Sequence, residues 1–129
     1  MKRIRLKGKL RVEIIRNGKV VKRIEKRNLI VDAGISYVAG LINGINTTPF
    51  QYIAIGEGTT APSSSDTALE SEIMRTLATT SLVTTSKAND TARWEAEFSI
   101  TASYSISEAG IFNASSGGTM LARQTFSPV

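Results

Sequence analysis

Apolar and charged residues alternate at the start of the chain. Apolar residues occupy even positions, at Ile4, Leu6, Leu10, Val12 and Ile14, and charged residues occupy the odd positions between them. A period of two is typical of a β-strand with one buried face and one solvated face. Asn17-Gly18 follows, a dipeptide that favours hairpin turns. The pattern therefore predicts a β-hairpin over residues 1–27.

The loop length decides the register of this hairpin. A two-residue loop at 17–18 would bring apolar residues opposite charged ones, which mixes the two faces. A three-residue loop at 16–18, with Gly18 in the left-handed region, would instead place Leu10 opposite Ile24. Because the longer loop keeps apolar residues together, we expect that register and a positive φ at Gly18.

Helical spacing follows the hairpin. Apolar residues recur three and four positions apart, at Ile35, Val38, Leu41 and Ile42. Asp32 can cap the start of this helix, and Gly44 can end it. A second, shorter helix is expected where Leu69 and Ile73 lie one turn apart, capped by Ser65 or Asp66.

Short strands are expected around a loop rich in Gly, Pro, Ser and Thr at 57–66. Residues 51–56 form a short apolar run. Residues 76–86 are rich in Thr, Val and Leu, which favour strands. Asn89-Asp90 indicates a turn.

The longest alternation in the chain comes next. Its apolar members are Trp94, Ala96, Phe98, Ile100, Ala102, Tyr104 and Ile106. This pattern predicts a long antiparallel strand whose polar side faces solvent or a partner. Trp94, Phe98 and Tyr104 are expected in the core or in a subunit interface. Residues 108–113 and 119–126 predict a hairpin across 114–118.

These elements predict one mainly β domain over 1–129, with a basic β-hairpin at 1–27 and a mainly β body at 28–129. The expected architecture is an antiparallel β-sandwich or open barrel of about six to seven strands, with one or two short helices. The chain has no cysteine and no histidine, which excludes disulfides and removes the commonest general base. No apolar run approaches the ~20 residues of a membrane helix, so we expect no membrane partner.

Charge divides the chain into two parts. Residues 1–27 contain twelve of the sixteen Lys and Arg residues and two acids, a net charge of +10. Residues 28–129 contain four bases and nine acids, a net charge of −5. The expected docking cations lie on the exposed strand face, at Arg3, Arg5, Lys7, Lys9 and Arg11. They could bind an acidic protein surface or nucleic acid. Because residues 1–27 contain no aromatic residue on which bases could stack, we favour protein.

Catalytic and ligand-binding chemistry is weakly represented. The segment Gly56-Glu57-Gly58 fits a loose dinucleotide fingerprint, but Pro62 follows where a helix should begin, so a structural turn is favoured. Lys87 could activate a serine, although a solvated strand end is the simpler interpretation. Several acids could attract Ca²⁺ without the spacing of a calcium loop, namely Glu57, Asp66, Glu70 and Glu72. We therefore expect no catalytic residue, no metal and no cofactor.

Two stretches carry a recognisable motif. One runs from Ile53-Ala54-Ile55-Gly56-Glu57-Gly58 through Pro62 to Arg75, and the other runs from Glu108-Ala109-Gly110-Ile111-Phe112 to Arg123. Over roughly residues 51–126 they resemble the N-terminal domain of tailed-phage tail-collar fibre proteins. The matching motif residues are Gly56, Gly58, Pro62, Leu69, Arg75, Glu108, Gly110, Phe112 and Arg123. Glu108 is expected to pair with Arg75 or Arg123.

The resemblance implies a non-enzymatic structural protein of a tailed-phage virion, synthesised in the host cytoplasm. Its expected partners are other virion proteins, from the capsid or the tail, and further copies of itself. The basic hairpin and helix ahead of the motif depart from the family pattern. Capsid decoration and tail fibre or baseplate attachment therefore both stay open. The alternative function is a nucleic-acid-binding module that uses the basic hairpin.

Overall fold

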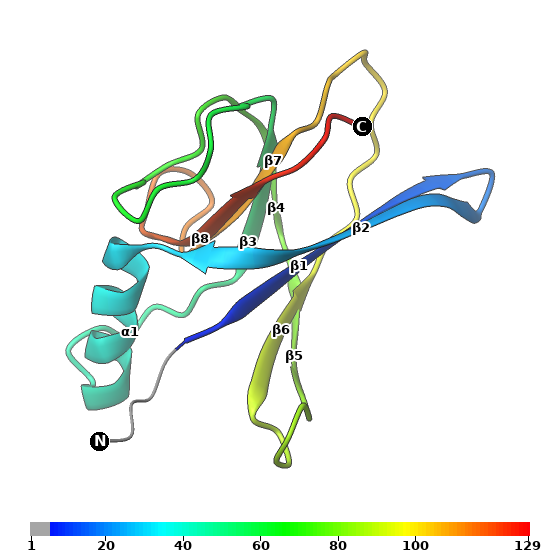
Figure 1. The fold of residues 1–129 in the computed structure, drawn as a ribbon. Helices are drawn as coiled ribbons and strands as arrows, with labels where there is room; N and C mark the ends of the chain where they lie inside the picture. The colour runs from blue at the N-terminus through cyan, green and yellow to red at the C-terminus, as the bar shows by residue number, and fades with distance from the viewer. Residues whose placement is uncertain (1–5) are drawn as a thin grey trace.

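One curled antiparallel sheet organises the computed structural model, which describes residues 6–129 (Figure 1). Its six strands follow the order β1-β2-β8-β7-β3-β4 and form an open half-barrel. The strands are β1 (Gly8–Arg16), β2 (Lys19–Ile30), β3 (Tyr52–Gly56), β4 (Glu72–Leu77), β7 (Glu108–Phe112) and β8 (Met120–Thr125). A separate hairpin comprises β5 (Thr79–Val83) and β6 (Thr91–Glu95), and the helix is α1 (Asp32–Asn43). The predicted mainly β class with an open barrel is confirmed, with eight strands and one helix in the described residues.

The β1–β2 hairpin keeps the predicted alternation but not the predicted register. Exposed and half-buried residues alternate from Gly8 to Ile14. The turn has two residues, and both Asn17 and Gly18 have positive φ, at 52° and 75°. The expected three-residue loop is therefore wrong, and so is the pairing of Leu10 with Ile24, although the positive φ at Gly18 is confirmed.

A β-bulge changes the register beyond the short loop. The register shifts between Ile14 and Ile15, which inserts one extra residue into β2. Beyond the bulge, Val12 lies opposite Ile24 and Leu10 opposite Lys26. The bulge thereby brings Ile24 onto the apolar face opposite Val12, although a lysine still lies opposite Leu10. Leu10, Val12 and Ile24 pack against the core of the half-barrel.

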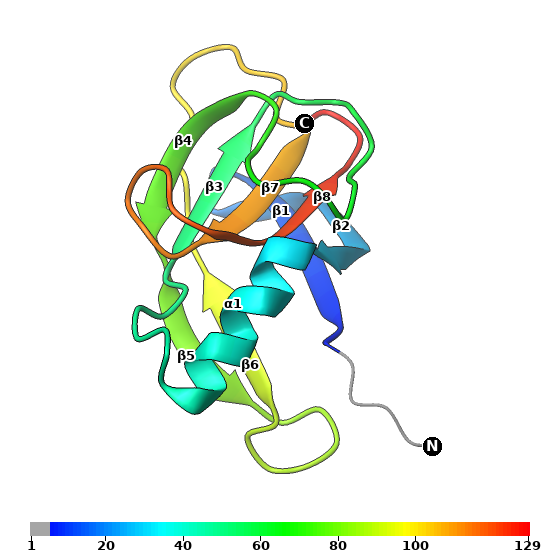
Figure 2. The same ribbon diagram turned by 90° about the vertical axis from the view of Figure 1, so that its left-hand side faces the viewer.

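The helix α1 packs against β8 (Figure 2). At one point of this contact the backbones of the two elements approach each other closely. Gly34 is buried, and a Cβ atom there would lie 2.5 Å from the carbonyl oxygen of Leu121. Ile35 and Ile42, which were expected on the packed face, are exposed. Asp32 makes no capping hydrogen bond with its side chain, so that prediction is wrong, whereas Gly44 ends the helix at a φ of 83° as expected.

The middle of the chain departs furthest from the expectation. Residues 65–71 form an irregular loop rather than a second helix, and Ile73 belongs to β4. The predicted strand at 76–86 is divided between β4 and β5, with the buried Ala78 at the break. The predicted long strand ends at Glu95, and residues 96–105 have no ladder partner, whereas Ile106 and Ser107 make backbone hydrogen bonds with Val129, Phe126 and Gly56. A strand needs a hydrogen-bonding neighbour, which alternation alone does not supply.

Three clusters of buried side chains form the core. One contains Val31, Ala54, Leu69, Phe112 and Met120 between the sheet and the loop that follows β3. Trp94 and Phe98 are partly buried against the other two clusters, as expected for core residues. Tyr104 is instead 40% exposed. The β7–β8 hairpin forms as predicted and supplies buried residues to all three clusters.

Candidate functional site: the Glu108 cluster, the hairpin tip and the Trp94 groove

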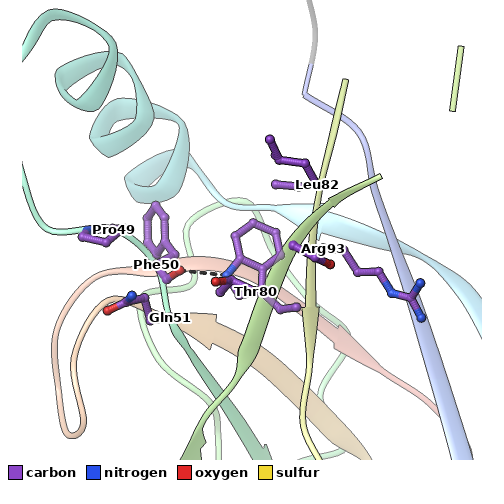
Figure 3. Close-up of a pocket in the computed structure, with 9 residues that line it drawn as sticks. Pro49, Phe50, Gln51, Thr80, Leu82 and Arg93 are labelled. Atoms are coloured by element: carbon purple, nitrogen blue, oxygen red, sulfur yellow. Dashed lines mark hydrogen bonds between the residues drawn. The ribbon is translucent and has the colours of Figure 1, made fainter. Parts of the chain in front are cut away.

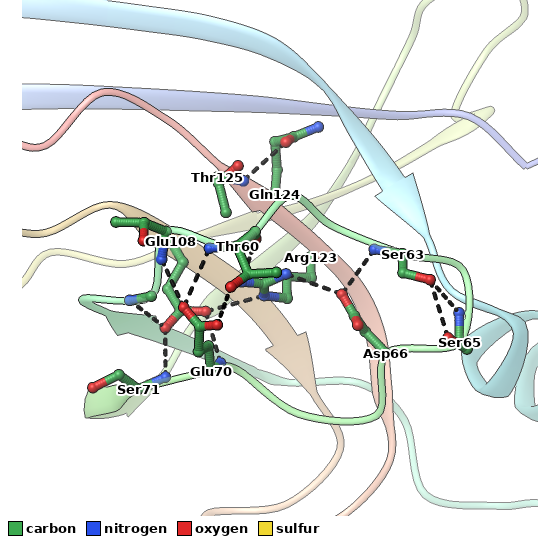
Figure 4. Close-up of polar contacts among 12 residues, drawn as sticks. Thr60, Ser63, Ser65, Asp66, Glu70, Ser71, Glu108, Arg123, Gln124 and Thr125 are labelled. Atoms are coloured by element: carbon green, nitrogen blue, oxygen red, sulfur yellow. Dashed lines mark hydrogen bonds and ion pairs between the residues drawn. The ribbon is translucent and has the colours of Figure 1, made fainter.

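Glu108 is a fully buried carboxylate at the start of β7 (Figure 4). Its Oε2 atom accepts hydrogen bonds from the backbone N–H groups of Gly58 at 2.7 Å and Ser71 at 2.8 Å. Its Oε1 atom accepts from the N–H of Glu70 at 2.9 Å and from Arg123 Nε at 3.0 Å. Four donors surround this charge, which satisfies the requirement for burying it. The carboxylate thereby ties the loop between β3 and β4 to the sheet.

Arg123 completes this set of contacts, which we call the Glu108 cluster. Besides Glu108, it donates from Nη1 to Asp66 at 3.0 Å and from Nη2 to the carbonyl oxygen of Thr60 at 3.0 Å. Its side chain is 3% exposed. Of the two arginines expected for Glu108, Arg123 is the partner and Arg75 is not. The cluster joins β7, β8 and the loop after β3.

Arg75 has a separate structural role. It pairs with Glu72 and donates to the carbonyl oxygens of Ala114 and Gly117, at 2.9 and 2.8 Å. Its guanidinium carbon lies 3.8 Å from the centre of the Phe112 ring. Arg75 therefore holds the β7–β8 turn against the edge strand β4.

The glycines of the first motif stretch are explained by close packing around Glu108. A Cβ atom on Gly56 would lie 2.6 Å from Glu108 Oε2, and one on Gly58 would lie 2.4 Å from it. A Cβ on Gly110 would lie 3.0 Å from Leu69. These positions need glycine so that the loop can approach the carboxylate, as a structural turn requires. Pro62 is half-buried in the same loop.

The motif residues therefore meet in space. Gly56, Gly58, Leu69, Glu108 and Gly110 lie in or directly beside the Glu108 cluster. Sequence reasoning paired Glu108 with arginine but missed the three backbone N–H donors. Those donors carry no residue-type signal, because every residue except proline has a backbone N–H.

The acids that were considered for Ca²⁺ each have another contact. Glu57 accepts from the Ser105 N–H, Asp66 pairs with Arg123, Glu72 pairs with Arg75, and Glu70 accepts from Thr59 and Thr60. The Thr60 hydroxyl, followed by the Thr60 and Thr59 N–H groups, lowers the pKa of Glu70 below its ordinary value. No group of three or more metal-ligating side chains occurs within residues 6–129.

The expected docking cations differ in their exposure and in their ion-pair partners. Arg3 and Arg5 lie outside the described residues, and Lys7 is exposed. Lys9 and Arg11 both pair with Glu25, each at 3.0 Å. The hydrogen bond and charge of Lys9 lower the pKa of Glu25, with a smaller contribution from Arg11. Part of the basic face is therefore neutralised within the hairpin.

The hairpin tip, residues 15–22, carries cations that differ from Lys9 and Arg11 in their ion pairing. In the described part of the chain, no ion pair involves Arg16, Lys19 or Lys22. Ile15, Val20 and Val21 are exposed beside them. The tip was not among the predicted docking residues, although its apolar run between two lysines was visible in the sequence.

A groove separates the body from the β5–β6 hairpin (Figure 3). This Trp94 groove has a volume of about 330 Å³ and is lined by Phe50, Trp94, Leu82, Pro49, Thr80 and Arg93, among others. Trp94 Nε1 donates to the Phe50 carbonyl oxygen at 2.7 Å, which fixes the indole ring. Leu82 is 63% exposed beside it. The groove thus presents Leu82 to solvent beside a half-buried Trp94, whereas Phe50 is buried.

Neither a protein-family model, a curated protein nor a solved structure matches this chain. Across residues 6–129, no helix has both the length and the apolar character needed to cross a membrane.

Proposed function

We propose that this protein is a non-enzymatic structural subunit on the surface of a tailed-phage virion. The observation that carries the proposal is the Glu108 cluster. Two of the motif residues that resemble the tail-collar fibre family, Gly58 and Arg123, lie 50 and 15 residues from Glu108 in sequence and both donate to its buried carboxylate. Since all four donors to Glu108 come from the chain itself, this charged group serves to hold the fold together.

The extent of exposed surface supports an assembling subunit. The chain exposes 8670 Å², whereas about 6,700 Å² is expected for a compact monomer of 13.9 kDa. Eleven large hydrophobic side chains of the described residues are exposed. Both projecting hairpins contribute to them (Figure 1). Such surface is typical of a protein that buries it against partners.

Two locations on the virion fit the proposal. The resemblance to fibre proteins favours attachment at the tail fibre or baseplate. The projecting basic hairpin equally suits a capsid decoration subunit that clamps onto a shell. In either place the mechanism is burial of apolar strand surface between subunits, with opposite charges guiding docking.

Purified particles provide the test. Mass spectrometry should find the chain at a fixed ratio to the capsid or tail proteins, and imaging of labelled particles should place it on the surface. Charge reversal at Arg3, Arg5, Lys7 and Lys9 should reduce its incorporation while the isolated protein stays folded. Reversal of Lys87, which lies in the β5–β6 loop, is the control. Absence of the chain from purified particles would refute the proposal.

Nucleic-acid binding is the second candidate, because Arg16, Lys19 and Lys22 form a cationic tip without acidic partners among the described residues. Phosphate contacts of this kind weaken steeply as salt is added. If the tip only docks on protein, binding to duplex DNA or RNA should be weak, independent of sequence and lost at physiological salt. Tight binding that survives physiological salt would favour this candidate instead.

A further inference from the structure

The hairpin tip combines apolar exposure with positive charge. Ile15, Val20 and Val21 are 49%, 47% and 55% exposed, and Ile15 lies directly opposite Val20. The bulge places Val21 next to this pair. In Figure 1 the hairpin extends to the right, beyond the rest of the sheet. A cluster of aliphatic side chains at the end of a projecting arm is suited to insertion into an apolar groove.

The Trp94 groove is lined mostly by apolar and uncharged side chains, and Arg93 is the charged residue in its lining. Its half-buried aromatic residue, Trp94, is of the type that anchors protein interfaces. Thr80, Ser81 and Leu82 of β5 line the groove and are exposed. A two-stranded sheet is marginally stable alone, so β5 and β6 would gain stability from a covering partner.

We propose that the hairpin tip of one copy docks into the Trp94 groove of a second copy of this chain. The inference rests on the proposed structural role and deepens it by naming the partner. In Figure 1 the β1–β2 hairpin points to the right and the β5–β6 hairpin points downward, so the two surfaces lie on different sides of the molecule. Joining two different surfaces makes a head-to-tail contact, which generates rings or filaments.

Charge and area both favour a second copy as the occupant. Residues 1–27 carry a net charge of +10 and residues 28–129 carry −5, so each arm is attracted to the body of another copy. The surface in excess of a compact monomer is about 2,000 Å². A stable interface buries about 1,600 Å² in total, so the excess is sufficient for one.

Sedimentation of the full chain, from micromolar to millimolar concentration, tests the contact from both sides. The tip variant is Val21→Glu and the groove variant is Leu82→Glu, each at an exposed position. Ile42→Glu is the matched control, because Ile42 is 82% exposed on α1 and belongs to neither surface. We expect wild type and control to assemble equally. Both interface variants should associate more weakly than wild type, by a factor of about ten or more. A monomeric wild type, or either interface variant assembling like wild type, overturns the proposal.

Mixing the two variants identifies the geometry. Val21→Glu retains an intact groove and Leu82→Glu retains an intact tip, so the mixture should form a one-to-one complex at a concentration at which each variant alone is monomeric. A mixture that stays monomeric overturns the head-to-tail contact. Circular dichroism checks folding, and Val20→Glu and Thr80→Glu serve as second variants for the tip and the groove.

The outcomes also separate this inference from the proposed function. A chain that is present in purified particles but monomeric in solution, with no effect of Val21→Glu on incorporation, keeps the structural role and refutes self-docking. Assembly that depends on Val21 and Leu82, in a chain absent from particles, keeps self-docking and refutes the virion role. If Val21→Glu leaves assembly unchanged but abolishes salt-resistant DNA binding, the tip is a nucleic-acid surface and the self-docking proposal is wrong.

Discussion

The Glu108 cluster and the β1–β2 hairpin each contain an ion pair between an arginine and a glutamate. The pair in the cluster is buried, and the pair in the hairpin is exposed. Arg123 Nε lies 3.0 Å from Glu108 Oε1, and Arg11 Nε lies 3.0 Å from Glu25 Oε1. The side chains of the first pair are 3% and 0% exposed, whereas those of the second are 49% and 38% exposed. The two pairs therefore have the same length but differ in burial and in the other donors that surround the carboxylate.

Burial changes what removal of one partner costs. An exposed pair is screened by water and salt, and each partner is solvated again when the other is lost. A buried pair has no such alternative, because the remaining charge and its donors are left without partners. The comparison teaches that a hydrogen-bond length does not measure the contribution of an ion pair to stability.

The largest effect should come from Glu108→Ala. The substitution leaves the buried Nε of Arg123 and three backbone N–H groups without their acceptor, so we expect a loss of about 3–5 kcal/mol. This is a large part of the stability of a small domain. Urea unfolding followed by circular dichroism measures it, with Glu25→Ala as the matched control. Equal midpoints for the two variants would contradict the comparison.

Gly58→Ala tests how tightly the loop packs around the buried Glu108 cluster, without removing any charge. The added Cβ would lie 2.4 Å from Glu108 Oε2 and 2.5 Å from Glu70 Cβ. Overpacking of this kind costs about 1–3 kcal/mol. The same urea titration should show a lower midpoint with an unchanged slope, since the folded state is strained but not rearranged. A midpoint equal to that of wild type would show that the loop can yield.

Gly18→Val tests the hairpin through its backbone alone. A Cβ at Gly18 would meet nothing within 4 Å, so any cost arises from its φ of 75°. A β-branched residue in the left-handed region should destabilise by about 1–2 kcal/mol. Thermal unfolding measures the difference. Gly18→Asn is the control and should be nearly neutral, because asparagine tolerates this conformation.

Glu70 is intermediate between the buried Glu108 and the exposed Glu25. It is exposed, and yet it accepts hydrogen bonds from backbone N–H groups. Its pKa in the folded state is lowered below the ordinary 4.5. The stabilisation it provides is therefore present above the unfolded pKa and is lost as pH falls through the lower, folded pKa. Comparison of wild type with Glu70→Gln between pH 7 and pH 2 should show a gap in midpoint that closes toward the acid end. A gap that widens on acidification would contradict this assignment.

The smallest effect should come from Glu25→Ala, on the exposed side of the comparison. Its partners Lys9 and Arg11 return to solvent, so the unfolding midpoint should change little, and added salt should reduce the change further. Thermal unfolding at low and high salt measures both. A loss as large as that of Glu108→Ala would mean that the hairpin pair is not screened.

The sequence alone determined the features that depend on neighbours along the chain. Alternation predicted the exposed and buried faces of β1, Asn17-Gly18 predicted the turn, and Gly44 predicted the end of α1. The β7–β8 hairpin was predicted with nearly correct bounds. These features follow from local backbone preferences and from the two-residue period of a strand, so they need no knowledge of distant partners.

Tertiary structure decided everything that depends on a distant partner. Alternation continues from Trp94 to Ile106, but only residues 91–95 find a neighbouring strand. Residues 65–71 have helical spacing, yet Glu108 captures the N–H groups of Glu70 and Ser71 and holds them in a loop. The bulge between Ile14 and Ile15 shifts the register so that Val12 lies opposite Ile24, a pairing that the short turn alone would not give. Each outcome depends on hydrogen bonds and packing between segments far apart in sequence, which local pattern does not encode.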